Sequence, residues 1–221
     1  MSTESAEITT NRVLQKDTTY QLIKHEILTG KLSESTLLSE RSLTKRFSTG
    51  KASVRDAIAR LCSQGYLSIV PQRGVFVSHF SIKDMTDVFE LRALIEPSIV
   101  SGLAGKIDDR LRVELAETLE NQEKYARVQD VENFILQDLQ FHMQLSRAYA
   151  NREITRVMEH NCELVLRSLY PILSRKLECL KLAYNDHRLI FQALCDGKQE
   201  EAVSRTIRHI KSTKSLISNL S

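Results

Sequence analysis

Residues 37–77 read LLSERSLTKRFSTGKASVRDAIARLCSQGYLSIVPQRGVFV, and this stretch decides the fold of the N-terminal part of the chain. Leu38, Leu43 and Phe47 mark one apolar face. A second face has the i, i+3, i+4, i+7 spacing of a helix packed on a core, and it consists of Val54, Ala57, Ile58 and Leu61. The short break at residues 47–50 is typical of the turn in a helix-turn-helix.

The end of the same stretch predicts a β-hairpin. Gly65 ends the last helix, and the β-rich residues 66–70 and 75–77 then flank the turn Pro71-Gln72-Arg73-Gly74. A further helix over residues 14–28 precedes the stretch; its apolar stripe is Leu22, Ile23 and Ile27. A helix-turn-helix followed by a hairpin with a basic tip is a winged helix. The first hypothesis is therefore a DNA-binding head over residues 11–79.

Composition sets the outer limits. A chain of 221 residues holds one large or two small domains, and it contains no run of 18 apolar residues that could cross a membrane. Residues 1–10 are polar and lack the apolar segment of a secretory signal, so they are expected to form a disordered lead. The four cysteines form no CxxC pair and are expected to be reduced core thiols. A cytoplasmic protein without a membrane partner is expected.

Charge is unevenly placed along the chain. Residues 1–80 hold 11 Lys and Arg against 7 Asp and Glu, whereas residues 81–221 hold 20 against 21. A weakly basic head on a near-neutral body suits an N-terminal part that meets phosphates.

From Ser81 onward, strand signals nearly vanish and helical periodicity dominates. We expect six helices, interrupted or bent locally at Pro97 and Pro171, over residues 83–104, 108–127, 131–149, 151–173, 176–196 and 198–219. The predicted fold is mainly α: an N-terminal winged helix-turn-helix with a small β-wing, then an antiparallel six-helix bundle over residues 80–221.

Several polar residues of the head could touch DNA. The N-terminal residues of the third helix should lie in the major groove, where Lys51 can donate to guanine and Ser53 can reach a base or a phosphate. Arg55 lies one turn after Lys51, Arg41 starts the preceding helix, and Arg73 lies at the wing tip. Any one of them could be an ordinary solvated charge, but together they favour a DNA-binding surface.

The body carries a second constellation. Asp138 and His142 are four residues apart and so share one face of a helix, while His187 and His209 lie on two later helices, 22 residues apart across a tight turn. One carboxylate and three imidazoles would suit Zn²⁺, Ni²⁺ or another borderline divalent ion and leave positions open for a ligand oxygen. The alternative is that these histidines are hydrogen-bonded core residues.

The head resembles the winged helix of GntR-type bacterial transcription regulators. The resemblance covers residues 14–79 and is carried by Leu38-x-Glu40-x-x-Leu43, residues 53–58, Gly65-Tyr66-Leu67 and Pro71-x-Arg73-Gly74-x-x-Val77. Gly50-Lys51 stands where Ser-Arg is common in that family. The resemblance implies DNA contacts at Arg41, Lys51, Ser53, Arg55, Arg73 and Gly74.

The body is similar to the FCD effector domain of the FadR subfamily over residues 83–215. The similarity is carried by Phe89-Glu90-Leu91-Arg92-x-x-Ile95-Glu96-Pro97, Asp138-x-x-Phe141-His142-x-x-Leu145 and His187-x-x-Ile190, with His209. It implies that Asp138, His142, His187 and His209 hold a divalent metal, and that a small carboxylate effector binds beside it with help from Arg92. The alternative role for Arg92 is helical ion pairing with Glu90 and Glu96.

The leading interpretation is a ligand-responsive transcription regulator, a homodimer that binds a roughly palindromic operator on double-stranded DNA. A small carboxylate would shift operator affinity by stabilising one of two states. The alternatives are a helical metal-dependent enzyme with an accessory DNA-binding head, and an architectural DNA-binding protein whose bundle only dimerises.

Overall fold

The computed structural model describes residues 3–33 and 36–218, with side chains for residues 16–33 and 36–217. The chain divides into two compact units, Met1–His79 and Phe80–Ser221. Each unit has its own buried apolar core.

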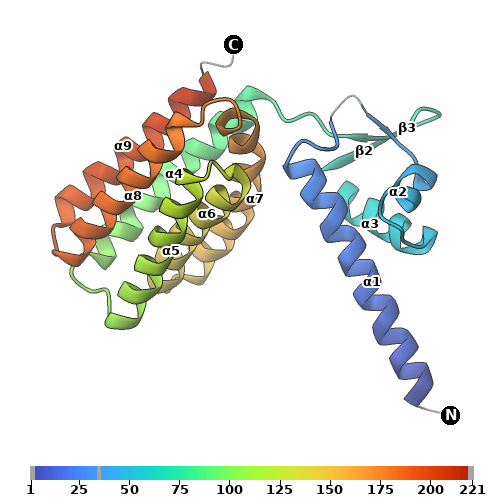
Figure 1. Cartoon of the computed structure of the whole chain (residues 1–221), viewed down its shortest axis with the longest axis horizontal. Coiled ribbons are helices and arrows are strands. Elements are labelled where there is room, and N and C mark those ends of the chain that lie inside the picture. The colour runs from blue at the N-terminus through green and yellow to red at the C-terminus, as the bar shows by residue number, and fades with distance from the viewer. Residues whose placement is uncertain (1–2, 34–35, 219–221) are drawn as a thin grey trace. The chain divides into compact units, whose positions relative to one another are not determined.

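The first unit is a winged helix-turn-helix (Figure 1). Its elements are α1 (Thr3–Leu28), β1 (Leu37–Leu38), α2 (Glu40–Arg46), α3 (Lys51–Ser63), β2 (Leu67–Val70) and β3 (Gly74–Val77). Ile23 of α1, Leu43 of α2 and Leu61 of α3 are almost inaccessible to solvent and form the centre of its core. The two apolar faces expected from the sequence therefore meet each other and α1.

Local signals explain where these helices begin and end. The side chain of Ser39 accepts a hydrogen bond from the backbone N–H of Ser42 and caps α2. Gly65 follows α3 with a φ of +78°, a conformation that glycine adopts without strain. The chain then turns directly into β2.

The sheet of the wing has three antiparallel strands in the order β1-β3-β2, where the sequence predicts only a two-stranded hairpin. Leu37 pairs with Phe76 and Leu38 with Val75, so the segment before α2 supplies the third strand. Two residues are too short for a periodic signal, which is why the pattern of the sequence does not reveal β1.

Two expectations for α1 need correction. The helix begins at Thr3, so residues 3–10 are helical rather than a disordered lead; residues 1–2 lie outside the described part. The segment contains neither glycine nor proline to stop a helix. Leu22 is 42% exposed, and the buried apolar side chains among those described for α1 are Tyr20, Ile23, Ile27 and Leu28.

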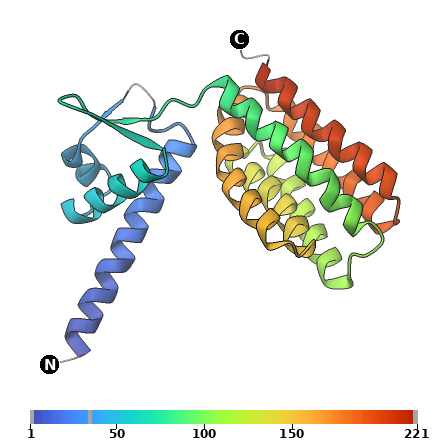
Figure 2. The same cartoon turned by 180° about the vertical axis from the view of Figure 1, so that it is seen from behind.

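The second unit is a bundle of six helices (Figures 1 and 2). They are α4 (Ile82–Leu103), α5 (Asp109–Arg127), α6 (Val131–Ala148), α7 (Arg152–Leu173), α8 (Glu178–Cys195) and α9 (Gln199–Ser218). Packed neighbours run α4, α9, α8, α5, α6, α7 and back to α4, so the helices form a closed ring. Figure 2 shows α4 and α9, distant in sequence, side by side.

Proline does not end the helices of the bundle. Pro97 lies inside α4 and Pro171 inside α7, so both helices continue through their prolines over nearly the bounds expected from the sequence. Each removes one backbone N–H, and packing on both sides of the helix retains the helical path.

None of the helices in the described part of the chain combines the length and apolar content that a bilayer-spanning segment needs.

Candidate functional site: a buried carboxylate and histidine cluster, and a basic face

Three helices bring Asp138, His142, His187 and His209 together inside the bundle. α6 supplies Asp138 and His142, α8 supplies His187 and α9 supplies His209; all four side chains are buried. Their candidate ligand atoms all lie within 4.8 Å of one another. Residues far apart in the sequence thus present one carboxylate and three imidazoles to a single point.

The geometry fits a shared cation. Nε2 of His187 lies 3.1 Å from Nε2 of His209 and 3.5 Å from Oδ1 of Asp138. Two nitrogens bound at about 2.1 Å to one ion lie roughly 3.0–3.4 Å apart at ordinary coordination angles. Within the described residues, Oδ2 of Asp138 and Nε2 of His142 are buried without a hydrogen-bond partner, although such atoms in native proteins are normally satisfied.

The other ring nitrogen of each histidine faces an oxygen. Nδ1 of His142 lies 2.8 Å from Oε2 of Glu96, Nδ1 of His187 lies 2.9 Å from Oε1 of Gln122, and Nδ1 of His209 lies 3.6 Å from Oδ2 of Asp186. The sequence interpretation assigns none of these three oxygens. Gln122 had one signal: it continues the buried stripe of α5 after Leu115 and Thr118, where a polar residue needs a partner.

Electrostatics at the cluster are set by burial and by one guanidinium. Burial opposes ionisation of Glu96, but Arg92 and His142 outweigh it and hold the pKa of Glu96 below its usual range. Burial lowers the pKa of His142, and burial together with His209 lowers the pKa of His187 well below the ordinary value. Both imidazoles are therefore neutral at pH 7, the form that binds a metal.

Arg92 is among the most completely buried large side chains of the chain. Its Nε donates a hydrogen bond to Glu96 one turn later, and its guanidinium lies 5.3 Å from the centre of the Phe89 ring. Burial opposes its charge, yet Glu96 and Asp138 raise the pKa of Arg92. Nη2 of Arg92 has no hydrogen-bond partner within the described residues. Glu90, the other expected partner, pairs with Lys214 instead.

A small cavity adjoins the cluster. Its polar lining comes from Glu96, His142 and Thr206, and its apolar lining includes Phe141 and Ile190. Its volume of about 10 Å³ has room for about one water molecule. Nearby, burial raises the pKa of the Cys162 thiol to about 12.

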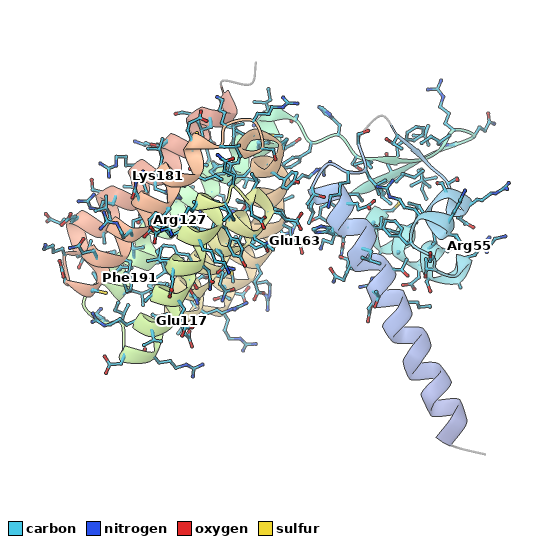
Figure 3. All side chains as sticks on the ribbon, viewed as in Figure 1. Arg55, Glu117, Arg127, Glu163, Lys181 and Phe191 are labelled. Carbon is cyan, nitrogen blue, oxygen red and sulfur yellow. The ribbon has the colours of Figure 1, made fainter. Side chains whose placement is uncertain are left out.

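The basic face of the first unit gathers most of the expected DNA contacts. Arg41 on α2 and Lys51 and Arg55 on α3 are exposed, and Figure 3 shows Arg55 at the surface of the unit. Arg73 is exposed in the turn between β2 and β3, followed by Gly74 with a φ of +111°. Ser53 differs: it is buried, so its hydroxyl does not lie on the outer face with Lys51.

An ion pair orders this face. Nε of Arg55 lies 2.8 Å and 2.9 Å from the two carboxylate oxygens of Glu40, so α2 and α3 are joined across the turn between them. The hydrogen bond from Arg55 lowers the pKa of Glu40 and raises the pKa of Arg55. Glu40 lies in the quoted Leu38-x-Glu40 motif, but the sequence did not reveal its partner.

Comparison with known proteins assigns both units to families. The model of the bacterial regulatory proteins of the gntR family matches residues 15–77, and the FCD domain model matches residues 87–212. The gluconate operon transcriptional repressor of Bacillus subtilis (strain 168) is 26% identical over 178 residues, which cover 78% of this chain and 72% of that protein. The Nta operon transcriptional regulator of Aminobacter aminovorans is 23% identical over 174 residues, or 79% and 80% of the two chains.

Solved structures share the fold. A GntR transcriptional regulator from Rhodococcus sp. RHA1 aligns with a TM-score of 0.78 and 19% identity over 93% of this chain and 98% of that one. McbR/YncC of E. coli aligns with a TM-score of 0.74 and 19% identity, covering 93% and 98%. The two family matches together span both units, and the chain therefore belongs to the GntR family of DNA-binding bacterial transcription regulators that carry an FCD domain, and not to a family of enzymes.

Proposed function

We propose that this regulator binds a divalent metal in its FCD domain and changes its affinity for operator DNA when a small carboxylate binds beside that metal. Asp138, His142, His187 and His209 would hold the ion, with Zn²⁺ or Ni²⁺ the best match to this donor set. The observation that carries the proposal is the convergence of four buried ligand atoms within 4.8 Å, two of them unpartnered. The ion would supply a positive charge that attracts a carboxylate oxygen.

Arg92 would hold the other end of the acid. Its unpartnered Nη2 can donate to a carboxylate while its Nε keeps the bond to Glu96. The cavity beside His142 has room for about one water only, so the acid would bind a state in which the helices around it have moved apart. A ligand that binds only this wider state shifts the equilibrium toward it.

The basic face would bind the operator, with two heads of a homodimer on two half-sites. Arg41, Lys51 and Arg55 are exposed and available for phosphate or base contacts, with Arg73 and Gly74 at the wing. Ser53 would act through its backbone N–H near the start of α3, because its side chain is buried. The protein would act in the cytoplasm, and the repressors among its relatives favour repression.

Elemental analysis of purified protein, before and after incubation with Zn²⁺ or Ni²⁺, tests the metal. One ion per chain is expected, with strong loss in Asp138→Ala and His187→Ala. Calorimetric titration with small acids then tests the effector, beginning with gluconate because a relative is named for a gluconate operon. Absence of stoichiometric metal in both preparations would contradict the metal site.

Mobility shifts across a salt series test the DNA surface. Arg55→Ala and Arg73→Ala should each weaken binding and reduce the slope of log K against log salt by about 1, because one phosphate contact is removed. Arg110→Ala, an exposed arginine of the second unit, is the control and should leave the slope unchanged. Equal slopes for all three variants would contradict the proposed surface.

A further inference from the structure

The three histidines of the cluster share one orientation: Nε2 faces the other ligands and Nδ1 faces an oxygen from elsewhere in the bundle. The oxygens come from three helices, α4 (Glu96), α5 (Gln122) and α8 (Asp186). Two of these contacts, at 2.8 Å and 2.9 Å, are within hydrogen-bonding distance, while the 3.6 Å contact of Asp186 is too long.

Gln122 faces His187 at the centre of the bundle. Both side chains are fully buried, and Oε1 of Gln122 is 2.9 Å from Nδ1 of His187. A neutral imidazole carries a single N–H, so an acceptor at Nδ1 places the proton there and leaves a lone pair on Nε2. Nε2 is the atom that faces Asp138 and His209.

Glu96 serves two partners. One oxygen accepts a hydrogen bond from Nε of Arg92, and the other lies 2.8 Å from Nδ1 of His142. The carboxylate is therefore fixed by a buried guanidinium on its own helix, and its second oxygen, which has no other hydrogen-bond partner within the described residues, faces an imidazole on α6. Nε2 of His142, on the far side of that ring, is one of the two unpartnered ligand atoms of the cluster within the described residues.

We infer that Gln122 and Glu96 are positioning residues: each fixes the ring orientation and proton position of one histidine so that its Nε2 lone pair points at the shared ion. The inference rests on the proposed metal site and adds residues that touch no metal. Partners of this kind typically change metal affinity by about 10–100-fold when they are removed.

Titration with Co²⁺ alone, with affinity measured against a competing chelator, tests the inference. Gln122→Met keeps the size of the side chain but offers no oxygen, and it should lower Co²⁺ affinity by about 10–100-fold. Gln122→Glu keeps an acceptor at the same place and should restore affinity to within a few-fold of wild type. The visible absorption bands of bound Co²⁺ should change in Gln122→Met, because they depend on the geometry of the ligands.

Gln144→Met is the matched control. Gln144 lies on α6 and bonds to Thr118 and to the backbone carbonyl of Glu114 on α5, so it too is a glutamine that joins two helices of the bundle, but its hydrogen bonds go to these two groups rather than to a histidine of the cluster. Its substitution should leave Co²⁺ affinity and spectrum unchanged. Wild-type affinity and spectrum in Gln122→Met, or an equal loss in Gln122→Met and Gln122→Glu, would overturn the role of Gln122.

Glu96→Gln provides a second arm if Gln122→Met fails to unfold cooperatively. The carboxamide keeps the shape but loses the charge that strengthens its bond to Arg92 and its contact with His142, so Co²⁺ affinity should fall about tenfold. Wild-type affinity in this variant would overturn the role of Glu96. Absence of Co²⁺ binding by the unchanged protein would overturn the metal site itself, an outcome distinct from loss in the variants alone.

Discussion

At the residue scale, buried charge governs the second unit. Arg92, Glu96, Asp138 and three histidines lie in one interior, where Arg92 and Glu96 form a buried ion pair and Asp138 contacts His187. The sequence motifs point to Arg92 and to the four candidate ligands. Gln122 and Asp186 were not found because their roles depend on which helices become neighbours, and spacing along a single helix carries no information about that.

The buried pair of Arg92 and Glu96 should be far more important for stability than an exposed pair of the same spacing. Arg92→Ala leaves the Glu96 carboxylate buried without its guanidinium, which should lower the free energy of unfolding by about 3–5 kcal/mol. Arg110 and Glu114 form the exposed equivalent, also one turn apart. Urea denaturation should show an unchanged midpoint for Arg110→Ala; similar behaviour of the two variants would contradict the assignment.

Acid should destabilise the metal-free protein through His142 and His187. Burial lowers the pKa of both below about 6.5, the value in an unfolded chain. Below that pH these histidines bind protons in the unfolded chain but not in the folded chain. Their contribution to the free energy of unfolding is therefore present above about pH 6.5 and is lost as the pH falls. Between pH 7.5 and 5.5 the free energy of unfolding should drop by about 1–3 kcal/mol.

Urea unfolding of chelator-treated protein at the two pH values measures this loss. His160 lies exposed on α7, so His160→Gln should show the same drop as wild type. His187→Gln should show a smaller drop in the free energy of unfolding, because one of the two buried imidazoles is removed. Equal stability of the wild type at both pH values would contradict the explanation.

At the scale of elements, periodicity predicted the helices well. The six body helices lie within a few residues of their expected bounds because each has a long apolar stripe and a clear break, such as Asp108 or Asn151, whose side chains cap α5 and α7. The miss has a physical cause: β1 has two residues and depends on β3 for its pairing. The helices α4 and α7 continue through their prolines, as the expected bounds required, because tertiary packing outweighs one lost hydrogen bond.

The wing depends on Gly74. Its φ of +111° strains any other residue, and an added Cβ would lie 2.6 Å from Cδ1 of Leu37 on β1. Gly74→Ala should destabilise the first unit by about 1–3 kcal/mol and weaken operator binding. Gly50→Ala is the control, since Gly50 has an ordinary φ and open space around it, and this substitution should lower the free energy of unfolding by less than Gly74→Ala does. Thermal unfolding followed by circular dichroism compares the two; equal effects would contradict the role of the wing.

At the scale of the whole molecule, the division into two compact units separates the consequences of metal binding. All four candidate ligands belong to the second unit. A metal that binds only the folded form stabilises that unit by about 2.7 kcal/mol when its free concentration is 100 times Kd.

In calorimetric melting experiments, Zn²⁺ should therefore raise the melting temperature of the second unit and leave that of the first unit unchanged. Asp138→Asn should abolish the shift. An equal shift of both transitions would contradict independent units, and the same shift in Asp138→Asn would contradict the site.

The position of α4 in the chain has a mechanical consequence. It begins at Ile82, three residues after the first unit ends, and it carries Glu96 and Pro97 in its second half. Fourteen residues of helix form a rod of about 21 Å, so a tilt of about 5° at Glu96 displaces the start of α4 by about 2 Å. Pro97 removes the backbone bond to Ala93, which makes the rod most compliant beside Glu96. A shift of the Glu96 carboxylate would therefore also move the start of α4, which only residues 80–81 separate from the last residue of the first unit.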